Sequence, residues 1–546
     1  MYSDALDTSY RPNDSIDSDE ELDSPDTSPW NDSVTSDDEG PDAECSTSAT
    51  TTNPVKERKF IVCASMLLQL FSVCRECLAP THTSLKERGT LLHAVTVCVR
   101  GHKTVWESQP RINGKALMNL LLPAAITFSG ASPTRVIRLL SSVGVAVLQK
   151  SQLFLIQGCL VFPAAAKVWK EEKTTLLTAM RGSKLHLAGD GRADSPGYSA
   201  KYGTYTLLET NINKILHFEV IQSTEVKSSN NMETEGLKRS FDHLQGWGFC
   251  PHVLVTDRHF GVNALMKSNY PNTKHRFDAW HVAKGIGSKL ALAGKTKRNS
   301  LLNKWVKTVR AHVYWCAQTS DDNGALVLAK WMSLMRHVDN VHQHPDPLYP
   351  ACTHAPIVEE RCVFIRCASS LPFNLVLFLT AGTEPYDALE KVVMSRQLLK
   401  DIPKLSGDGQ TYRLESFHSL LLRFTPKSSH FSLEGMEART AIAVLHYNAN
   451  SDRKQATTKD GKDCFVLKFP KARKGEWVVN RKMEPASYDY TQKLFGCFLE
   501  LAEGVRTYQE AQATYVPRSR GRPLCSVSQR PNKEAAVLAH RSRFSI

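Results

Sequence analysis

The stretch VTDRHFGVNALMKSNYPNTKHRFDAWH, residues 255–281, holds two aspartates that each end a short strand-like run. The runs are HVLVTD, which ends at Asp257, and TKHRFD, which ends at Asp278. A helical pattern follows each run, and His281 comes shortly after Asp278. Carboxylates at these positions either cap turns or bind a positively charged group. The pattern predicts an α/β sheet with acidic side chains at the carboxyl ends of its strands, where such sheets bind ligands.

Upstream of this stretch lie three further strand-like runs and a helical pattern. The runs are SKLHLAGDG, GTYTLLET (203–210) and KILHFEVIQ (214–222), and the helix is predicted over 232–248. The resulting order, β-β-β-α-β-α-β-α, is that of the ribonuclease H-like fold. In that mixed sheet the first and fourth strands are neighbours, so Asp190 at the end of the first strand is expected beside Asp257.

A third carboxylate comes from the predicted helix in GQTYRLESFHSLLLRFTPKSSHF, residues 409–431, where Glu415 stands in the first turn. Neighbouring carboxylates repel each other unless a cation lies between them. Hard oxygen ligands select magnesium or manganese, and three acids suit a two-metal site for phosphoryl transfer. The alternative for Glu415 is an ordinary helix-start acid stabilised by the helix dipole.

Three blocks together resemble the transposase-derived DDE proteins of animal genomes, which are related to Kolobok elements and more distantly to Mutator-like ones. They are an Asp-Gly-x-x-x-x-Pro-Gly block, an Asp followed twenty-odd residues later by Asp-x-x-His, and a Leu-Glu-x-x-His-x-x-Leu helix. The resemblance covers roughly residues 60–450. The resemblance implies a ribonuclease H-like fold, with three acids that hold divalent metal for DNA cleavage and joining. One departure is that Kolobok-type proteins often begin with a zinc-dependent THAP domain, whereas this chain begins with an acidic tail.

By position, the resemblance assigns magnesium or manganese binding to Asp190, Asp257 and Glu415. Asp194 competes with Asp190 for the first role. Asp278 and His281 resemble a pair that supports the site in Mutator-like relatives, and an ordinary helix histidine is the alternative for His281. The long interval between Asp257 and Glu415 predicts a helical insertion at about 290–385, with a basic start that suits phosphate contacts.

Two groups of cysteines and histidines have spacings that suggest metal binding. The first, in CRECLAPTHTSLKERGTLLHAVTVCVRGH, predicts a structural zinc site, with His82 and His93 as substitutes for one ligand. The second has the looser spacing H-x4-H-x9-C-x-H, which favours loop histidines without a metal. The predicted ligands of the first group are Cys74, Cys77, Cys98 and His102, and the second comprises His337, His342, His344, Cys352 and His354.

Charge is distributed unevenly along the 546 residues. Residues 1–54 hold 15 acidic residues and one Arg, whereas the remainder holds 67 Lys and Arg against 40 Asp and Glu. The acidic segment, rich in Ser, Thr and Pro, is predicted to be disordered, and the basic body indicates a polyanionic partner, of which nucleic acid is the commonest. Near the end, Arg520-Gly521-Arg522-Pro523 resembles an AT-hook core, with a plain basic tail as the alternative.

The predicted domain order is a disordered acidic tail (1–55), a zinc-ribbon-like module (56–110), a helical segment (111–182), the ribonuclease H-like domain (183–450) and a basic C-terminal region (451–546). No targeting segment is visible, and the apolar runs at 153–166 and 371–382 are too short to span a bilayer. We therefore expect a nuclear DDE transposase or a domesticated descendant that binds DNA and no membrane, with homo-oligomers left open. The alternative is a non-catalytic DNA- or chromatin-binding protein that keeps the fold.

Overall fold

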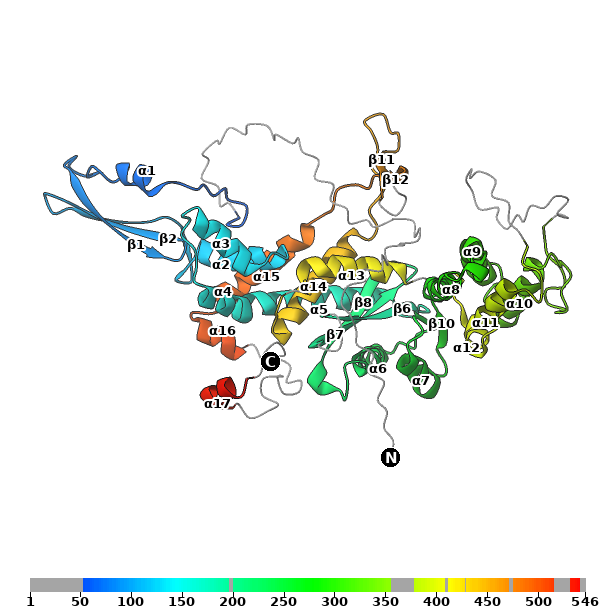
Figure 1. The fold of residues 1–546 in the computed structure, drawn as a ribbon. Helices are drawn as coiled ribbons and strands as arrows, with labels where there is room; N and C mark the ends of the chain where they lie inside the picture. The colour runs from blue at the N-terminus through cyan, green and yellow to red at the C-terminus, as the bar shows by residue number, and fades with distance from the viewer. Residues whose placement is uncertain are drawn as a thin grey trace. The chain divides into compact units, whose positions relative to one another are not determined.

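The computed structural model describes residues 53–195, 200–354, 378–407, 411–427, 429–470, 475–514 and 531–540 (Figure 1). The acidic segment up to residue 52 and the AT-hook-like Arg520–Pro523 lie outside these ranges. Contacts divide the chain into two compact units, each described here by itself. The larger comprises Ser46–Asn448 with Asp489–Ile546, and the described part of the smaller is Ala449–Tyr488.

A five-stranded mixed sheet forms the centre of the larger unit, in the strand order β10-β9-β6-β7-β8. β6 pairs antiparallel with β7 and parallel with β9. The expected contact between the first and fourth strands of this region is therefore confirmed. The strands are β6 (His186–Ala193), β7 (Tyr202–Glu209), β8 (Lys214–Gln222), β9 (Val253–Thr256) and β10 (Lys274–Phe277).

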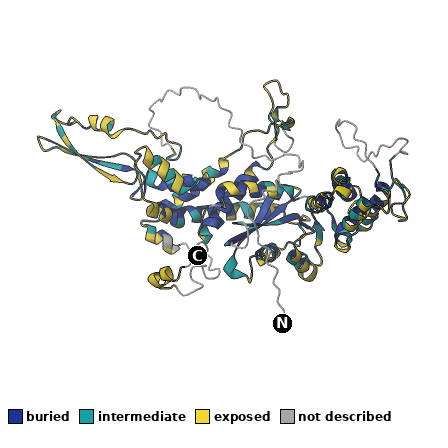
Figure 2. Ribbon diagram, in the orientation of Figure 1, coloured by how far each residue is buried: buried dark blue, intermediate teal, exposed yellow. Residues whose placement is uncertain are grey.

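Helices cover both faces of this sheet, so β7 is buried along its whole length (Figure 2). Tyr205 and Leu207 pack with α6 (Asn231–Gly246) and α7 (Phe260–Asn269) in one apolar cluster. Tyr202, whose side chain points the other way because side chains alternate along a strand, packs against Met436 of α14 (Leu433–Asn450). On that second face α5 (Phe162–Ala179) contacts β8, and α13 (Tyr412–Phe424) contacts β6.

The helices expected between 111 and 182 are present and pack with α15 (Asp489–Gly504). Lys150–Ala179 is one continuous helical stretch of 30 residues, with a π-helical turn in the middle. It is longer than the apolar run recognised in the sequence, and by length and composition it can cross a membrane. Half of its most apolar 18-residue window is buried inside the structure, as in the core helix of a soluble protein, so it is weak evidence for a span. The elements are α2 (Leu117–Phe128), α3 (Pro133–Ser142), α4 (Lys150–Ile156), η1 (Gln157–Val161) and α5 (Phe162–Ala179).

An antiparallel three-stranded sheet of β1 (Thr81–Arg88), β2 (Leu91–Cys98) and β3 (Lys103–Glu107) precedes these helices. β1 is mostly exposed, so this small sheet has little apolar core of its own. Three short elements are next to this sheet in the sequence: α1 (Ala64–Gln69), β4 (Arg111–Ile112) and β5 (Lys115–Ala116). The C-terminal part of the chain contains two more, α16 (Tyr508–Thr514) and α17 (Lys533–Leu538).

A helical region lies between β10 and α13 and has its own apolar cluster, which includes the fully buried Trp305 and Trp331. Residues 355–377, within this region, lie outside the described chain. Its helices are α8 (Ala279–Ala293), α9 (Leu302–Gln318), α10 (Gly324–Val338), α11 (Glu384–Val393) and α12 (Arg396–Asp401). The smaller unit contains a hairpin of β11 (Phe465–Lys468) and β12 (Val478–Arg481).

Candidate functional site

The parallel pairing of β6 with β9 sets the positions of the first two acids. The last paired residues are Ala188 and Val255, and β9 ends at Thr256. Continuing the register by two residues brings Asp257 level with Asp190, and neighbouring strands lie about 4.8 Å apart. Asp190 is not at the end of its strand, because β6 continues to Ala193 through its pairing with β7. It lies instead where the pairing with β9 stops.

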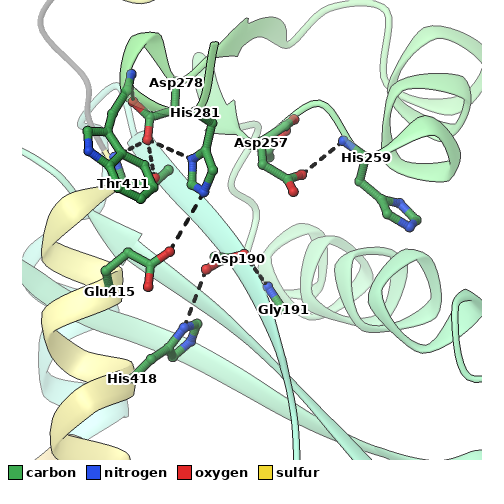
Figure 3. Close-up of polar contacts among 11 residues, drawn as sticks. Asp190, Gly191, Asp257, His259, Asp278, His281, Thr411, Glu415 and His418 are labelled. Atoms are coloured by element: carbon green, nitrogen blue, oxygen red, sulfur yellow. Dashed lines mark hydrogen bonds and ion pairs between the residues drawn. The ribbon is translucent and has the colours of Figure 1, made fainter. Parts of the chain in front are cut away.

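Each aspartate uses one carboxylate oxygen in a backbone hydrogen bond. The Gly191 N–H donates to Asp190 Oδ1 at 2.8 Å, and the His259 N–H donates to Asp257 Oδ1 at 2.9 Å (Figure 3). His259 is the N-cap residue of α7, so the start of that helix fixes the Asp257 side chain. Within the described residues Asp257 Oδ2 accepts no hydrogen bond, which leaves it available to a ligand.

Helix α13 brings two more side chains to the same place. His418 Nδ1 lies 3.3 Å from Asp190 Oδ2, and His281 Nε2 lies 3.7 Å from Glu415 Oε1. Glu415 and His418 are three residues apart in the helix, so they project from one face of it. Figure 3 shows both pointing toward Asp190 and His281 from a segment far away in the sequence. The prediction did not name His418, although that helical spacing could have revealed it.

The buried Asp278 and the half-buried His281 together support Glu415. Asp278 is the N-cap of α8, where its Oδ1 accepts from the Trp280 N–H at 2.9 Å. Its Oδ2 lies 3.1 Å from His281 Nδ1 and accepts from the Thr411 hydroxyl. Burial alone lowers the pKa of His281, but the Asp278 hydrogen bond and the neighbouring carboxylates outweigh burial and raise it. Asp278 thus orients the ring so that Nε2 faces Glu415.

Glu233, in the first turn of α6, is a fourth carboxylate that sequence reasoning missed. Burial, together with the charges of Asp257 and Asp190, raises its pKa to about 8. The side chain lies against β6 at Gly191, where a Cβ would come within 2.8 Å of Glu233 Cγ. A first-turn glutamate is ordinary in helices, so its only distinguishing signal was the glycine next to Asp190.

These residues fit a divalent cation by their chemistry. The donors are carboxylate oxygens, Asp257 has an open oxygen, and Glu233 is kept from ionising by negative neighbours that a cation would neutralise. The side chains do not yet form a ligand set. Among the described residues, the groups whose ligand atoms all lie within 4.8 Å of one another are two sets of Cys and His, and the acids are not among them.

Asp194, the competitor of Asp190, is engaged elsewhere. Its Oδ1 accepts from the Lys201 N–H at 2.9 Å, and its own N–H donates to the Tyr202 carbonyl at 3.0 Å. These bonds tie the chain just after β6 to the start of β7. Asp190, which faces His418 instead, is therefore the better placed of the two beside Asp257.

The predicted zinc ligands Cys74, Cys77, Cys98 and His102 come together in the N-terminal sheet, where they form one of the two Cys/His sets that can hold a metal ion such as zinc. Two tight turns supply them. In the first, the Leu78 N–H donates to the Cys74 carbonyl at 3.0 Å, and Leu78 has a φ of 57°. The second is the β2–β3 turn, where Gly101 has a φ of 85° and its N–H donates to the Cys98 carbonyl.

Distances within this set match tetrahedral zinc. Coordination at Zn–S of about 2.3 Å and Zn–N of about 2.0–2.1 Å separates two sulfurs by about 3.8 Å and sulfur from nitrogen by about 3.6 Å. Cys77 Sγ and Cys98 Sγ are 3.7 Å apart, and Cys74 Sγ lies 3.7 Å from His102 Nδ1. Backbone hydrogen bonds from Cys77 and Glu76 hold the pKa of the Cys74 thiol below its usual value, which favours the thiolate that zinc binds.

The two substitute ligands lie apart from this set. His93 Nδ1 is 3.1 Å from Glu107 Oε1, across the β2–β3 pairing. His82 is on β1, opposite Val97, and neither histidine belongs to the ligand set found in the described chain.

No family model and no curated protein matches the chain.

Proposed function

We propose that this chain is a DDE-type transposase, or a domesticated descendant of one, with a ribonuclease H-like core that cuts and joins DNA by divalent-metal chemistry. The observation that carries the proposal is the meeting of three distant segments at one edge of the sheet. The register of β6 and β9 sets Asp190 and Asp257 level, and α13 presents Glu415 and His418 beside them. The strand order β10-β9-β6-β7-β8 is the one expected for that fold.

In this proposal Asp190, Asp257 and Glu415 hold magnesium or manganese. Bound cations of this kind activate the attacking oxygen and stabilise the leaving oxygen of an in-line displacement. The protein's own part is positioning. Asp278 holds the His281 ring against Glu415, and His418 holds Asp190, so that each carboxylate is oriented by a neighbour.

DNA is the proposed partner and the nucleus the proposed location. The support is electrostatic: beyond residue 54 the chain carries 67 Lys and Arg against 40 Asp and Glu, which favours contact with phosphates. The zinc-binding set at Cys74–His102 and the basic Arg520-Gly521-Arg522 would add docking contacts outside the acidic site. Homo-oligomers enter the proposal for one reason, which is that DNA joining requires paired DNA ends.

The test compares Asp257→Asn with Asp194→Asn, which makes the same change on a carboxylate that accepts a backbone hydrogen bond from Lys201 between β6 and β7. Supercoiled plasmid and duplexes that carry the sequences flanking the coding region are incubated with each protein in magnesium or manganese. Asp257→Asn is expected to lower cleavage about a thousandfold, which corresponds to about 4 kcal/mol of lost transition-state stabilisation. Asp194→Asn is expected to stay within a few-fold of wild type.

DNA binding is measured in the same samples over a salt titration. It should persist in Asp257→Asn with the same steep dependence on salt, because the Lys and Arg residues that contact phosphate are unchanged. If the wild type neither cuts nor joins DNA and both proteins bind it equally well, a non-catalytic DNA- or chromatin-binding protein is the correct description.

A further inference from the structure

A second set of metal-type side chains gathers at the end of α10, far in sequence from the site above. His337 is in the last turn of the helix, and His342, Cys352 and His354 follow in the loop. The loop folds back on itself through a bridge between Gln343 and Ala351, with the Cys352 N–H donating to the His342 carbonyl at 3.0 Å. This bridge places His342 directly across from Cys352. The spacing alone favoured unrelated loop histidines because it does not reveal the fold-back.

The ligand atoms of these four residues all lie within 4.8 Å of one another. His337 Nδ1 is 3.4 Å from Cys352 Sγ, close to the sulfur–nitrogen edge of about 3.6 Å that a zinc tetrahedron requires. The ring centroids of His342 and His354 are 4.8 Å apart and nearly perpendicular, as are those of His337 and His354 at 5.4 Å. Rings at such angles can direct nitrogens to one point without stacking on each other.

His342 is held in the tautomer that a metal needs. Its Nε2 lies 3.0 Å from Asn340 Oδ1, an acceptor that requires a proton on Nε2. The remaining lone pair is then on Nδ1, which is buried and has no hydrogen-bond partner in the described chain. Asn340 is at a φ of 59°, in the turn that ends the helix. A histidine whose second nitrogen is fixed by an amide oxygen has the usual arrangement of a metal ligand.

His344 has a different place beside the same sulfur. Its Nε2 is 3.2 Å from Cys352 Sγ, and its ring is stacked on Tyr349 at a centroid distance of 5.4 Å. It lies outside the set of four. A neutral His344 can donate its Nε2–H to the sulfur and so stabilise the thiolate that binds metal, which makes it a supporting residue and not a ligand.

From these contacts we infer that His337, His342, Cys352 and His354 form a second structural zinc site. One thiolate and three imidazoles suit this borderline-soft cation, and four protein ligands leave no open position for catalysis. The site fastens the loop to the end of α10, whose Trp331 and Leu334 belong to the core of the helical region. The returning chain is tied to the same helix end, where the Leu379 N–H donates to the Val338 carbonyl at 2.8 Å. This role does not depend on the proposed reaction.

Zinc per chain in the purified full-length protein, measured by elemental analysis after dialysis, tests the inference. The wild type should hold two zinc ions, whereas Cys352→Ser and His342→Ala should each hold one. Cys250→Ser is the matched control, since Cys250 is exposed and outside both sets, and it should hold two. His344→Gln should also hold two, with an affinity at the second site about tenfold weaker.

Cobalt substitution gives a second readout, which reports the ligands of each ion directly. In wild-type protein loaded with cobalt, two tetrahedral ions should appear. Cys98→Ser, which disrupts only the N-terminal set, should leave a spectrum with charge transfer from a single thiolate. Wild-type protein that holds only one zinc, all of which depends on Cys98, would overturn the inference. Two zinc ions that remain in Cys352→Ser would overturn it equally.

Discussion

The Cys/His set of the N-terminal sheet and the acidic site at the edge of the central sheet differ in how their geometry arises. In the first, all ligands come from two tight turns, and the distances of 3.7 Å match a zinc tetrahedron. In the second, the acids come from β6, α6, the end of β9 and α13, and histidines stand between them. Local turns set the positions of the Cys/His ligands. In the acidic site, whose residues come from distant segments, neighbouring side chains are needed to orient the carboxylates.

The two sites also differ in how their surroundings affect ionisation. Backbone N–H groups favour the Cys74 thiolate in the first site. In the second, burial and the charges of Asp257 and Asp190 oppose the ionisation of Glu233. Hydrogen bonds thus favour a thiolate in the first site, whereas burial and neighbouring negative charge disfavour a further carboxylate in the second. Substitutions at the two sites should consequently differ in what they do to stability.

The largest effect is expected from Cys98→Ser in the N-terminal sheet. Structural zinc contributes roughly 10–16 kcal/mol to folding in zinc-finger peptides, and this sheet has little apolar core to compensate. Residues 71–107 should lose their protection in hydrogen exchange and become sensitive to protease. His82→Gln, on β1 but outside the ligand set, should keep both zinc and protection. Full protection in a zinc-free Cys98→Ser protein would show that the metal is not structural.

A smaller effect, with the opposite sign, is expected from Glu233→Gln. The folded-state pKa of Glu233, about 8, lies above its ordinary value of 4.5. The preference of the folded protein for protonated Glu233 therefore contributes its full stability below pH 4.5, and this stability is lost as the pH rises toward 8. In buffer without magnesium, Glu233→Gln should therefore gain stability over wild type between pH 5 and 8, by a few kcal/mol at most, as measured by urea unfolding.

Magnesium should shrink this gain, because a bound cation favours the ionised carboxylate. Glu235→Gln is the control on the same helix: Glu235 pairs with Arg239 at 2.7 Å, so its loss should give no gain at any pH. If Glu233→Gln is no more stable relative to wild type at pH 8 than at pH 5, burial and the neighbouring carboxylates do not raise the Glu233 pKa.

The smallest effect is expected from His93→Gln, which lies beside the zinc set without belonging to it. Arg111 makes two hydrogen bonds to Glu107, both at 2.7 Å, and is the main reason that the Glu107 pKa falls to about 2. Removal of His93 leaves that pair intact, so the cost in unfolding free energy should stay below about 1 kcal/mol. Zinc content should be unchanged; its loss would return His93 to the ligand set.

Sequence patterns predicted the parts that depend on short-range order. Strand and helix patterns predicted the element order β-β-β-α-β-α-β-α. The ribonuclease H-like fold with that order predicted that the strands of Asp190 and Asp257 are neighbours, and these strands do pair. The spacing of Cys74, Cys77, Cys98 and His102 gave the first zinc set because each close pair occupies one turn. The Cys/His ligands are close together in the chain within each turn, and Asp190 and Asp257 belong to strands that pair directly.

The parts that were missed depend on contacts between distant segments. Glu233 has the sequence position of an ordinary acid in a first helical turn. Only its packing against Gly191 of β6 places it beside Asp190. The second Cys/His group was recognised from its spacing, which favoured loop histidines without a metal. The approach of His337 to Cys352 depends on the fold-back of the loop after α10, which no local pattern predicts.

The central claim, that three acids from β6, the end of β9 and α13 bind one divalent-metal centre, can be tested by iron-directed cleavage of the protein. Ferrous iron replaces magnesium, and ascorbate with peroxide then cuts the backbone next to the bound ion. The account predicts cuts close to Asp190, Asp257 and Glu415, all suppressed by excess magnesium and all lost in Asp257→Asn. Cuts at only one of these segments, or cuts that magnesium does not suppress, would contradict a shared metal centre.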